Sequence, residues 1–338
     1  MGTNMLSINR WMAVKLEGTP GTIETVADAD FNVRIRNIEI TPNIPVDDEG
    51  AKYQTGNHAE DESLHGAQSV TIKCAVRAAW GGAVATPPDW WKLAQACGCG
   101  VLSYTTAGRG LVGRNAYDDT TASIIIADKE IGSSGGPITT LYKCAGCMGN
   151  MTLKADKVGD PWLAEFEFTG KMVDVVDGTA LVLTSPQTEL GEMFLSNVLT
   201  IDSVAKKVSK FQFTMGNTVS PIADQSNATG YSHYVITARK PRFSCDPLAV
   251  KQATTDWLND LLTENTGSAT LATAAATPHF TLRFPDLQPI TTALASREGL
   301  VAWENNYKAL MNGPATGALV DSTLTHEDTW ELLQGAKV

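Results

Sequence analysis

The sequence has little positive charge and few cysteines. Its 338 residues include 26 lysines and arginines against 37 aspartates and glutamates, which gives a formal net charge of −11. A protein that grips nucleic acid needs clustered basic residues, so this composition argues against tight binding, although not against letting nucleic acid pass. Six cysteines are too few for a disulfide framework in so long a chain, and we expect a protein made in a reducing cytoplasm.

Long apolar runs are also missing. No stretch approaches the roughly 20 apolar residues that a membrane-spanning helix needs, and the first residues, MGTNMLSINRW, lack the apolar core of a secretory signal. We therefore expect no membrane partner. Hydrophobic residues make up 43% of the chain, which predicts a globular protein with two domains, each large enough to bury a core.

Motifs for catalysis and nucleotide binding match by letters alone. GRGLVG (108–113) fits a dinucleotide fingerprint, but the residues after it lack the apolar period of a helix. GSSGG (132–136) fits a nucleophile elbow around Ser134, but Pro137 and an expected strand follow instead of a helix. The five histidines are scattered, and none lies in an HExxH motif. The sequence therefore predicts neither an enzyme nor a cofactor.

Two close cysteine pairs leave a metal site open. Cys97 and Cys99 form CxC, and Cys144 and Cys147 form CxxC. Two such pairs can build a tetrahedral zinc site, although CxC is the poorer clamp. The alternative, which we favour, is four unligated thiols that pack as small apolar side chains.

A strand followed by a helix occurs twice. The first copy begins SVTIKCAVR and ends LAQACG (69–98), and the second begins PRFSC and ends LTENTG (241–267). In each copy an alternating apolar run carries a central cysteine, Cys74 or Cys245, and an Asp-Trp pair opens the helix. Flanking segments also match: 36–43 with 209–217, and Trp162–Met172 with Leu300–Leu310. The repeat predicts one type of domain used twice.

The repeat and the turn signals divide the chain into five parts. We expect a mainly β protein with two tandem sandwich or barrel domains, each flanked by one α-helix. The parts are an N-terminal arm (1–30), a first domain (31–185), a linker (186–197), a second, diverged domain (198–311), and a C-terminal tail (312–338) with a short capped helix at Thr325–Gly335.

Three local features of the first domain can be predicted. The apolar residues change parity between Ile35 and Ile38, which indicates a β-bulge near Asn37. Leu141–Met151 and Trp162–Met172 have the pattern of the two arms of a hairpin. Thr86 and the proline after it are expected to cap the helix that carries the Trp pair.

The order of these elements resembles the major tail tube protein of long-tailed bacteriophages. The most specific parts are the hairpin GNMTLKA…LAEFEFTGKM (149–172) and the helix that ends ACG; VRIRNIEITP (33–42) and SVTIKCAVRAAWGG (69–82) precede them. The likeness covers residues 10–185, and the second half fits as a diverged copy. The CxxC and the long insert at 100–138 depart from the family pattern.

The resemblance implies small β-domains with one flanking helix that form rings and stack into a hollow tube for genome DNA. The chain is then a structural protein of the virion tail, assembled in the host cytoplasm, with other tail proteins at the tube ends. Since each chain holds two domains, three chains give a ring with pseudo-six-fold symmetry. The alternatives are a tail terminator or tube-initiating ring protein of the same fold, or a β-sandwich module that binds a carbohydrate or host surface.

Within this interpretation two groups of acidic residues are functional candidates. Along Trp162–Met172 the aromatic residues share one face and the glutamates the other, so Glu165, Glu167 and Glu39 are expected to line the channel, where negative charge repels DNA phosphates. The long acidic segment Asn43–Gly66 is expected to contact the next ring, a solvated loop being the alternative. Its candidates are Asp47, Asp48, Glu49, Glu60, Asp61 and Glu62.

Overall fold

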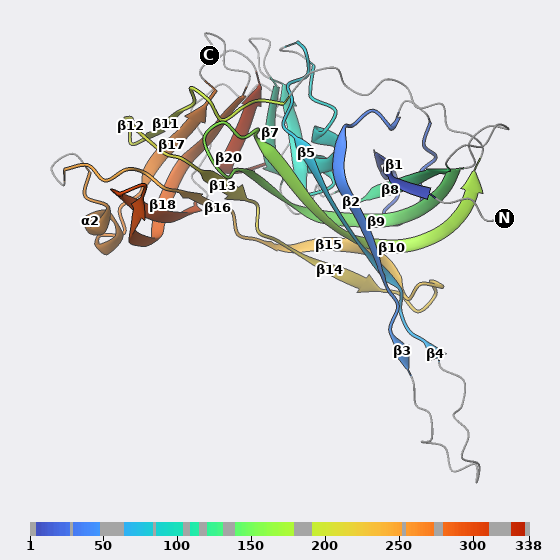
Figure 1. Cartoon of the computed structure of the whole chain (residues 1–338). Helices are drawn as coiled ribbons and strands as arrows, with labels where there is room; N and C mark the ends of the chain where they lie inside the picture. Colours follow the sequence, from blue (N-terminus) through green and yellow to red (C-terminus); the bar gives the residue numbers. More distant parts are fainter. Residues whose placement is uncertain are drawn as a thin grey trace, which may run out of the picture.

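A computed structural model shows a chain built mainly of antiparallel β-sheet, as the alternating sequence predicts (Figure 1). The structure describes residues 5–27, 30–47, 64–83, 86–103, 109–114, 120–130, 139–178, 191–251, 255–273, 280–310 and 326–334. Neither of the two helices within these ranges has the length and hydropathy that crossing a lipid bilayer requires.

In the first half of the chain, the described residues form ten strands and one short helix. They are β1 (Met5–Leu16), β2 (Ile35–Asn43), β3 (Val46–Asp47), β4 (Leu64–His65), β5 (Ser69–Arg77), α1 (Trp91–Gln95), β6 (Cys99–Ser103), β7 (Arg109–Arg114), β8 (Ala122–Glu130), β9 (Thr139–Ala155) and β10 (Leu163–Gly178).

The described residues of the second half form ten further strands and one helix. They are β11 (Val198–Ile201), β12 (Val204–Lys206), β13 (Phe211–Thr214), β14 (Asn217–Ala223), β15 (Tyr231–Arg239), β16 (Arg242–Cys245), α2 (Trp257–Leu262), β17 (Gly267–Ala272), β18 (Phe280–Arg297), β19 (Leu300–Ala309) and β20 (His326–Gln334).

The strands of the two halves pair in the same order. In the first half the hydrogen-bonded order is β1-β8-β9-β10-β5-β2. In the second half it is β11-β17-β18-β19-β16-β13. In both, a helix follows the fifth strand of this order, α1 after β5 and α2 after β16. All of these pairs are antiparallel.

The registers of the two halves also correspond, with one change from the sequence alignment. Ile40 lies opposite Ile72, and Phe213 lies opposite Phe243, which agrees with the sequence match of 36–43 with 209–217. In the hairpin the alignment is wrong by one residue. Cys74 pairs with Phe166, whereas Cys245 pairs with Asn305 rather than with the aligned Glu304. A slip of one residue exchanges the two faces of a strand, so the register gives the correct equivalence.

The two halves are joined into one sheet by a pair of strands. β13 of the second half pairs with the end of β9 in the first, with Phe211 opposite Ala155 and Thr214 opposite Thr152. On this edge of β9, β8 pairs with residues up to Cys147 and β13 with residues from Thr152. We call this pairing of β13 with β9 the internal junction.

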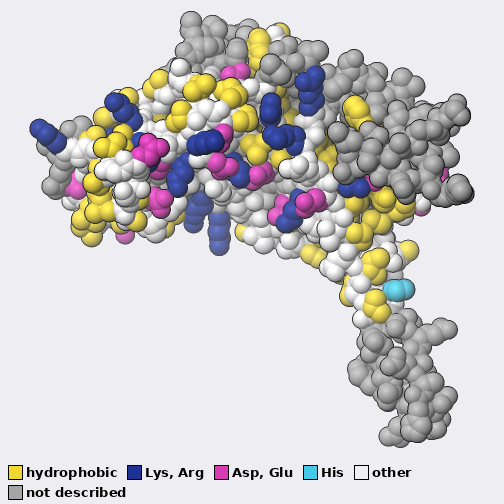
Figure 2. Space-filling view, viewed as in Figure 1, with side chains coloured by type: hydrophobic (Ala, Val, Ile, Leu, Met, Phe, Trp, Pro, Cys, Tyr) yellow, Lys and Arg dark blue, Asp and Glu magenta, His cyan; other side chains and the backbone are white. Residues whose placement is uncertain are grey.

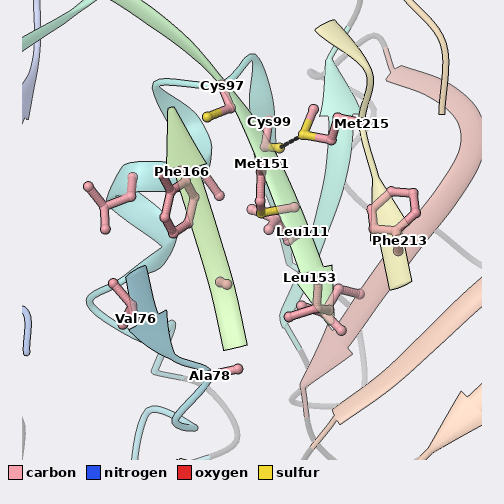
Figure 3. Packing of buried hydrophobic residues seen from close by; sticks show 14 of the residues in the cluster. Val76, Ala78, Cys97, Cys99, Leu111, Met151, Leu153, Phe166, Phe213 and Met215 are labelled. Carbon is pink, nitrogen blue, oxygen red and sulfur yellow. Dashed lines mark hydrogen bonds between the residues drawn. The ribbon is translucent and has the colours of Figure 1, made fainter. Parts of the chain in front are cut away.

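One apolar core runs through both halves beneath this sheet. Figure 3 shows side chains from both halves converging in it, including Phe166 of β10, Leu153 of β9 and Phe213 of β13. Four tryptophans, Trp90, Trp91, Trp162 and Trp330, are among its largest fully buried side chains. Trp90 of the α1 N-terminus also donates through Nε1 to the carbonyl of Ala79, at 2.9 Å. The sequence prediction of a core helix is confirmed, although the helix begins at Trp91 and has no side-chain cap.

The C-terminal helix predicted at Thr325–Gly335 is wrong, because residues 326–334 form strand β20. This strand pairs with β18 on one side and β7 on the other. Trp330, Leu332 and Gln334 are buried, whereas Leu333 is only half-buried, so the burial follows the period of a strand. Two partner strands supply hydrogen bonds and apolar contacts that outweigh the local capping pattern.

Part of the predicted N-terminal arm, residues 5–16, forms strand β1. β1 pairs with β8 along most of its length, and its end is fixed by the buried Glu17. The Glu17 carboxylate accepts hydrogen bonds from the Thr121 hydroxyl at 2.6 Å and from the Gly146 backbone N–H at 2.8 Å. Residues 5–16 therefore belong to the sheet.

The bulge and the hairpin predicted in the first domain are confirmed. The β2–β5 register shifts between Arg36 and Glu39, and Asn37 has a positive φ of 52°. β9 and β10 form the long hairpin predicted around residues 156–161.

Candidate functional site

Eight consecutive strands form a strip with one face on the core and the other on solvent. Their order is β2-β5-β10-β9-β13-β16-β19-β18. On β10, Phe166 and Phe168 are buried against the core, whereas Glu165 and Glu167 alternate with them and point away. Glu39 on β2 lies directly opposite Lys73 on β5, so it belongs to the same outer face. The three glutamates predicted to share a surface are therefore brought together.

Lysines that the sequence analysis did not single out accompany these glutamates. Lys73 Nζ lies 3.1 Å from a carboxylate oxygen of Glu167, and Lys154 Nζ lies 3.0 Å from one of Glu165. Within the second half, Lys210 Nζ lies 3.0 Å from a carboxylate oxygen of Glu304 on β19. Strand parity was the available signal, since Lys73 and Lys154 alternate with buried residues of their strands as the glutamates do.

On the outer face, the glutamates expected to supply negative charge are therefore paired with lysines. Figure 2 shows the same mixture over the middle of the visible face, with Lys and Arg side chains beside Asp and Glu. Partial burial lowers the pKa of Lys154, but its hydrogen bond to Glu165 and the nearby carboxylates raise it above the usual lysine value overall. The lysine thus keeps its proton at neutral pH.

A shallow pocket on this face crosses the internal junction. Its volume is about 160 Å³, and Lys210, Gln212, Ser244 and Glu304 are among its lining residues. The Lys210–Glu304 ion pair lies within it. Seven of its ten lining residues are polar, and the apolar ones, Ala155, Phe211 and Cys245, are themselves buried, so the pocket is best described as the surface of the strip.

The strip ends in two strand edges. In the described part of the chain, β2 pairs with β5 and with no other strand, and residues 288–297 of β18 pair only with β19. Close to the β18 edge lie three apolar side chains with large exposed fractions: Leu294 at 66%, and Leu300 and Val301 at 58% each. An open edge and an apolar patch together are typical of a surface that pairs with another chain.

The described ends of the acidic segment are the short strands β3 and β4, which pair with each other. Figure 1 shows β3 and β4 extending away from the rest of the sheet. Asp47 lies in β3, while Asp48, Glu49, Glu60, Asp61 and Glu62 lie outside the described residues. The predicted contact of these residues with a next ring stays a prediction.

The four cysteines considered for zinc all lie in the described part of the chain. All are buried, and the described residues contain no group of three or more His, Cys, Asp or Glu placed to hold a metal ion. Burial raises the pKa of the Cys144 thiol to about 12 and that of Cys97 and Cys147 well above the usual range. Cys99 Sγ lies 3.5 Å from the Met215 sulfur, in the apolar core that Figure 3 shows. Zinc is bound by thiolates, whereas these thiols stay protonated in apolar surroundings.

The two short sequence matches to nucleotide-binding and catalytic motifs show no matching geometry in the described residues. Arg109–Gly113 of the GRGLVG motif lies in strand β7 and not in a loop before a helix. GSSGG, with Ser134, falls outside the described residues.

Comparison with protein-family models and with curated proteins found no match for the chain. Its function is therefore inferred from the strand order, the outer face of the strip and the two edges.

Proposed function

We propose that this chain is the structural subunit of a bacteriophage tail tube, in which rings stack into a channel for genome DNA and no catalysis takes place. The observation that carries the proposal is the continuous eight-stranded strip, made of two halves with the same strand order, with a solvated charged face and two open edges. A strip of this kind is a segment of a barrel wall. The resemblance of residues 10–185 to the tail tube family supports the same assignment.

In this proposal the two halves are tandem tail-tube-like domains. Each has six strands in the same order and one helix after the fifth strand, α1 or α2. β1 is the counterpart of β11, so the first domain includes the N-terminal strand, and the linker precedes β11. β6, β7 and β20 are additions to this common plan, and they pair with one another and with β18.

Three chains then close a ring. Three strips of eight strands give 3 × 8 = 24 strands and six domains around the axis. With strands about 4.8 Å apart and tilted about 40°, 24 strands make a barrel of about 48 Å backbone diameter. Barrels of about 16 to 18 strands already leave an aqueous channel, so this lumen is open.

The charged face of the strip, which points away from the apolar core, suits the inner wall of such a channel. Glu39, Glu165 and Glu167 face the lumen together with Lys73 and Lys154, and paired charges give DNA phosphates no isolated cationic cluster to bind. The protein's net charge of −11 adds a long-range repulsion that salt screens. DNA is thus a passing partner, and the lasting partners are copies of the chain and the tail proteins at the tube ends.

The alternatives differ in assembly or in surface. A tail terminator or tube-initiating protein would form one ring and no tube. A carbohydrate-binding module needs exposed aromatic platforms, but all eight tryptophans are buried or half-buried. The observations therefore favour assembly over glycan binding.

Negative-stain electron microscopy of the purified protein tests the proposal. We expect hollow tubes with a ring repeat, and trimers as the smallest assembled particle in analytical ultracentrifugation. Single rings that never stack would favour the terminator. A protein that stays monomeric at all concentrations would exclude both.

A further inference from the structure

We propose that chains join head to tail by pairing β2 of one copy with the open edge of β18 of the next, with Glu39 opposite Ala295, Ile40 opposite Leu294 and Thr41 opposite Ala293. The closed ring rests on the proposed function, which this inference deepens by naming the partner strand and its register. The occupant of the β18 edge is a second copy of this chain.

The internal junction supplies the geometry. There, β13, which ends the hydrogen-bonded strand order of the second half, pairs with the edge of β9 in the first half. Gln212 lies opposite Lys154, Phe213 opposite Leu153, and Thr214 opposite Thr152. The hydroxyls of Thr152 and Thr214 are 3.2 Å apart on the outer face.

Because the two halves have equivalent strand registers, each residue of the internal junction has a counterpart on one of the two free edges. β2 is the counterpart of β13, since Ile40 occupies the place of Phe213 against the repeated strand. β18 is the counterpart of β9. Glu165 and Glu304 are equivalent, and their partners are Thr152 and Ala293, so Ala293 occupies the place of Thr152. One residue along, Leu294 occupies the place of Leu153.

The side chains at the free edges are more exposed than their counterparts at the internal junction, as expected if a partner strand is missing from the free edges of a single chain. Leu153, covered by β13, is 1% exposed, and Phe213 is fully buried. Their counterparts are Leu294, which is 66% exposed, and Ile40, which is half-buried. An exposed leucine on an unpaired strand edge is an aggregation hazard unless a partner covers it. The pairing with β2 of a second chain covers it as β13 covers Leu153.

The proposed pairing ends at Thr41 for a chemical reason. In the internal junction, the backbone N–H of Met215 donates to the carbonyl of Met151 at 3.0 Å, beyond the last paired residues. The residue after Thr41 is Pro42, which has no N–H to donate. Proline in a sheet is confined to edges and ends, so β2 is suited to a short pairing.

A second contact across the internal junction supports the same direction of assembly. The hairpin β14–β15, which follows β13, packs along β9 of the first half (Figure 1). Asn217 Nδ2 donates to the carbonyls of Cys97 at 2.8 Å and Gly149 at 2.9 Å, and Arg239 donates to the carbonyl of Gly98 at 3.2 Å. The counterpart of this hairpin is the strand pair β3–β4, which follows β2 and extends beyond the body. In the proposed assembly it reaches the second half of the neighbouring chain.

The interface is heterologous, because β2 and the β18 edge are different surfaces. Such contacts close into rings when the rotation per chain divides a full turn, and otherwise they form open helices. In the proposed ring, the internal and the intermolecular junctions alternate. A rotation of one sixth of a turn at each gives closure at three chains.

Engineered disulfides test the register. We would place T41C with A293C in one variant, and T152C with T214C in a matched control that bridges the internal junction. A third variant, T41C with A295C, is two residues out of register, at a diagonal Cα separation of about 7–8 Å that exceeds the disulfide range. Each protein is oxidised with oxidised glutathione and run on non-reducing gels, and its particles are imaged.

The expected result is covalent dimers and trimers for T41C/A293C, with no larger species, and a single-chain band for the control. Three results would overturn the pairing: assembled particles of T41C/A293C without interchain links, faster linking in T41C/A295C, or a ladder beyond three chains. Monomers alone would overturn it as well. Linked trimers that never stack would leave the pairing in place and refute the tail tube. Tubes without links would do the reverse.

A charge at the edge gives a second, independent readout. L294D should leave a folded monomer that no longer assembles, since its side chain is exposed in the free chain. L262D on α2, where the leucine is 74% exposed, is the matched control and should assemble normally. Assembly of L294D at the wild-type concentration would contradict the proposal.

Discussion

Lys154 of β9 reaches diagonally across the hairpin to Glu165 of β10, with 3.0 Å between its Nζ and the carboxylate oxygen. Lys73 of β5 makes the equivalent contact with Glu167 from the other side. Two neighbouring strands thus neutralise the glutamates of β10. The outer face of the strip is consequently a lattice of paired charges, and its response to mutation should be electrostatic more than structural.

Changing Glu165 and Glu167 together to lysine should leave the fold and the assembly intact but slow DNA ejection. Exposed ion pairs are worth about 0.2–1 kcal/mol each, so the loss of stability is small. The change places four lysines side by side on the proposed channel wall, where they attract phosphate. Ejection rates from phage particles carrying the variant measure the effect, with E165Q/E167Q as the uncharged control. If the carboxylates of Glu165 and Glu167 lie on the exterior of an assembled tube instead of in its lumen, the assignment is refuted.

Alanine substitutions along β20 distinguish a strand from a helix. Trp330 is 2% exposed and packs on Phe213 with ring centroids 4.8 Å apart, so W330A should cost about 3–5 kcal/mol. L332A should cost about 2–5 kcal/mol and L333A clearly less, because only Leu332 is fully buried. Urea unfolding measures the three values. A helix with Trp330 and Leu333 on its buried face would give the reverse order for the two leucines.

Asp246 should make stability depend on acid pH. Burial alone raises the pKa of its carboxyl, but hydrogen bonds from the Ser209 hydroxyl, from the backbone N–H groups of Ser209 and Lys210, and from Arg297 hold the pKa below its usual value. A depressed pKa stabilises the folded state above the unfolded value of about 4, and this stabilisation is lost as the pH falls through the folded pKa.

The D246N variant isolates that contribution. At pH 7 it should be less stable than the wild type in urea unfolding, and the difference should shrink as the pH is lowered below about 4. The exposed Asp174 of β10, changed to Asn, serves as the surface control. A pH-independent difference for D246N would show that the site acts by packing alone.

The native thiols should be inert in the folded protein. Burial raises the pKa of Cys74 and Cys144 to about 12, so at pH 8 these groups are protonated as well as inaccessible. A thiol reagent should label none of the six cysteines in native protein and all six in denaturant. Added zinc should leave the melting temperature unchanged. Rapid labelling of Cys97 or Cys147, or stabilisation by zinc, would contradict this account.

The sequence by itself determined the local features that depend on strand alternation. Val70, Ile72, Cys74 and Val76 alternate with Thr71, Lys73, Ala75 and Arg77 and form β5. The parity change at Asn37 identified the bulge, because one extra residue must reverse the faces of a strand. The alternation of aromatic residues with glutamates along β10 placed Glu165 and Glu167 on the outer face.

Only the tertiary structure decided which strands pair and in what register. The hairpin alignment differed by one residue from the true equivalence of Phe166 and Asn305, because weak identity does not distinguish two registers whereas hydrogen-bonded partners do. The segment His326–Gln334 has the local signals of a capped helix, yet β7 and β18 lie on either side of it and make it a strand. The paired residues of β18 lie more than 40 positions earlier in the chain and those of β7 more than 200, at a distance that no local pattern encodes.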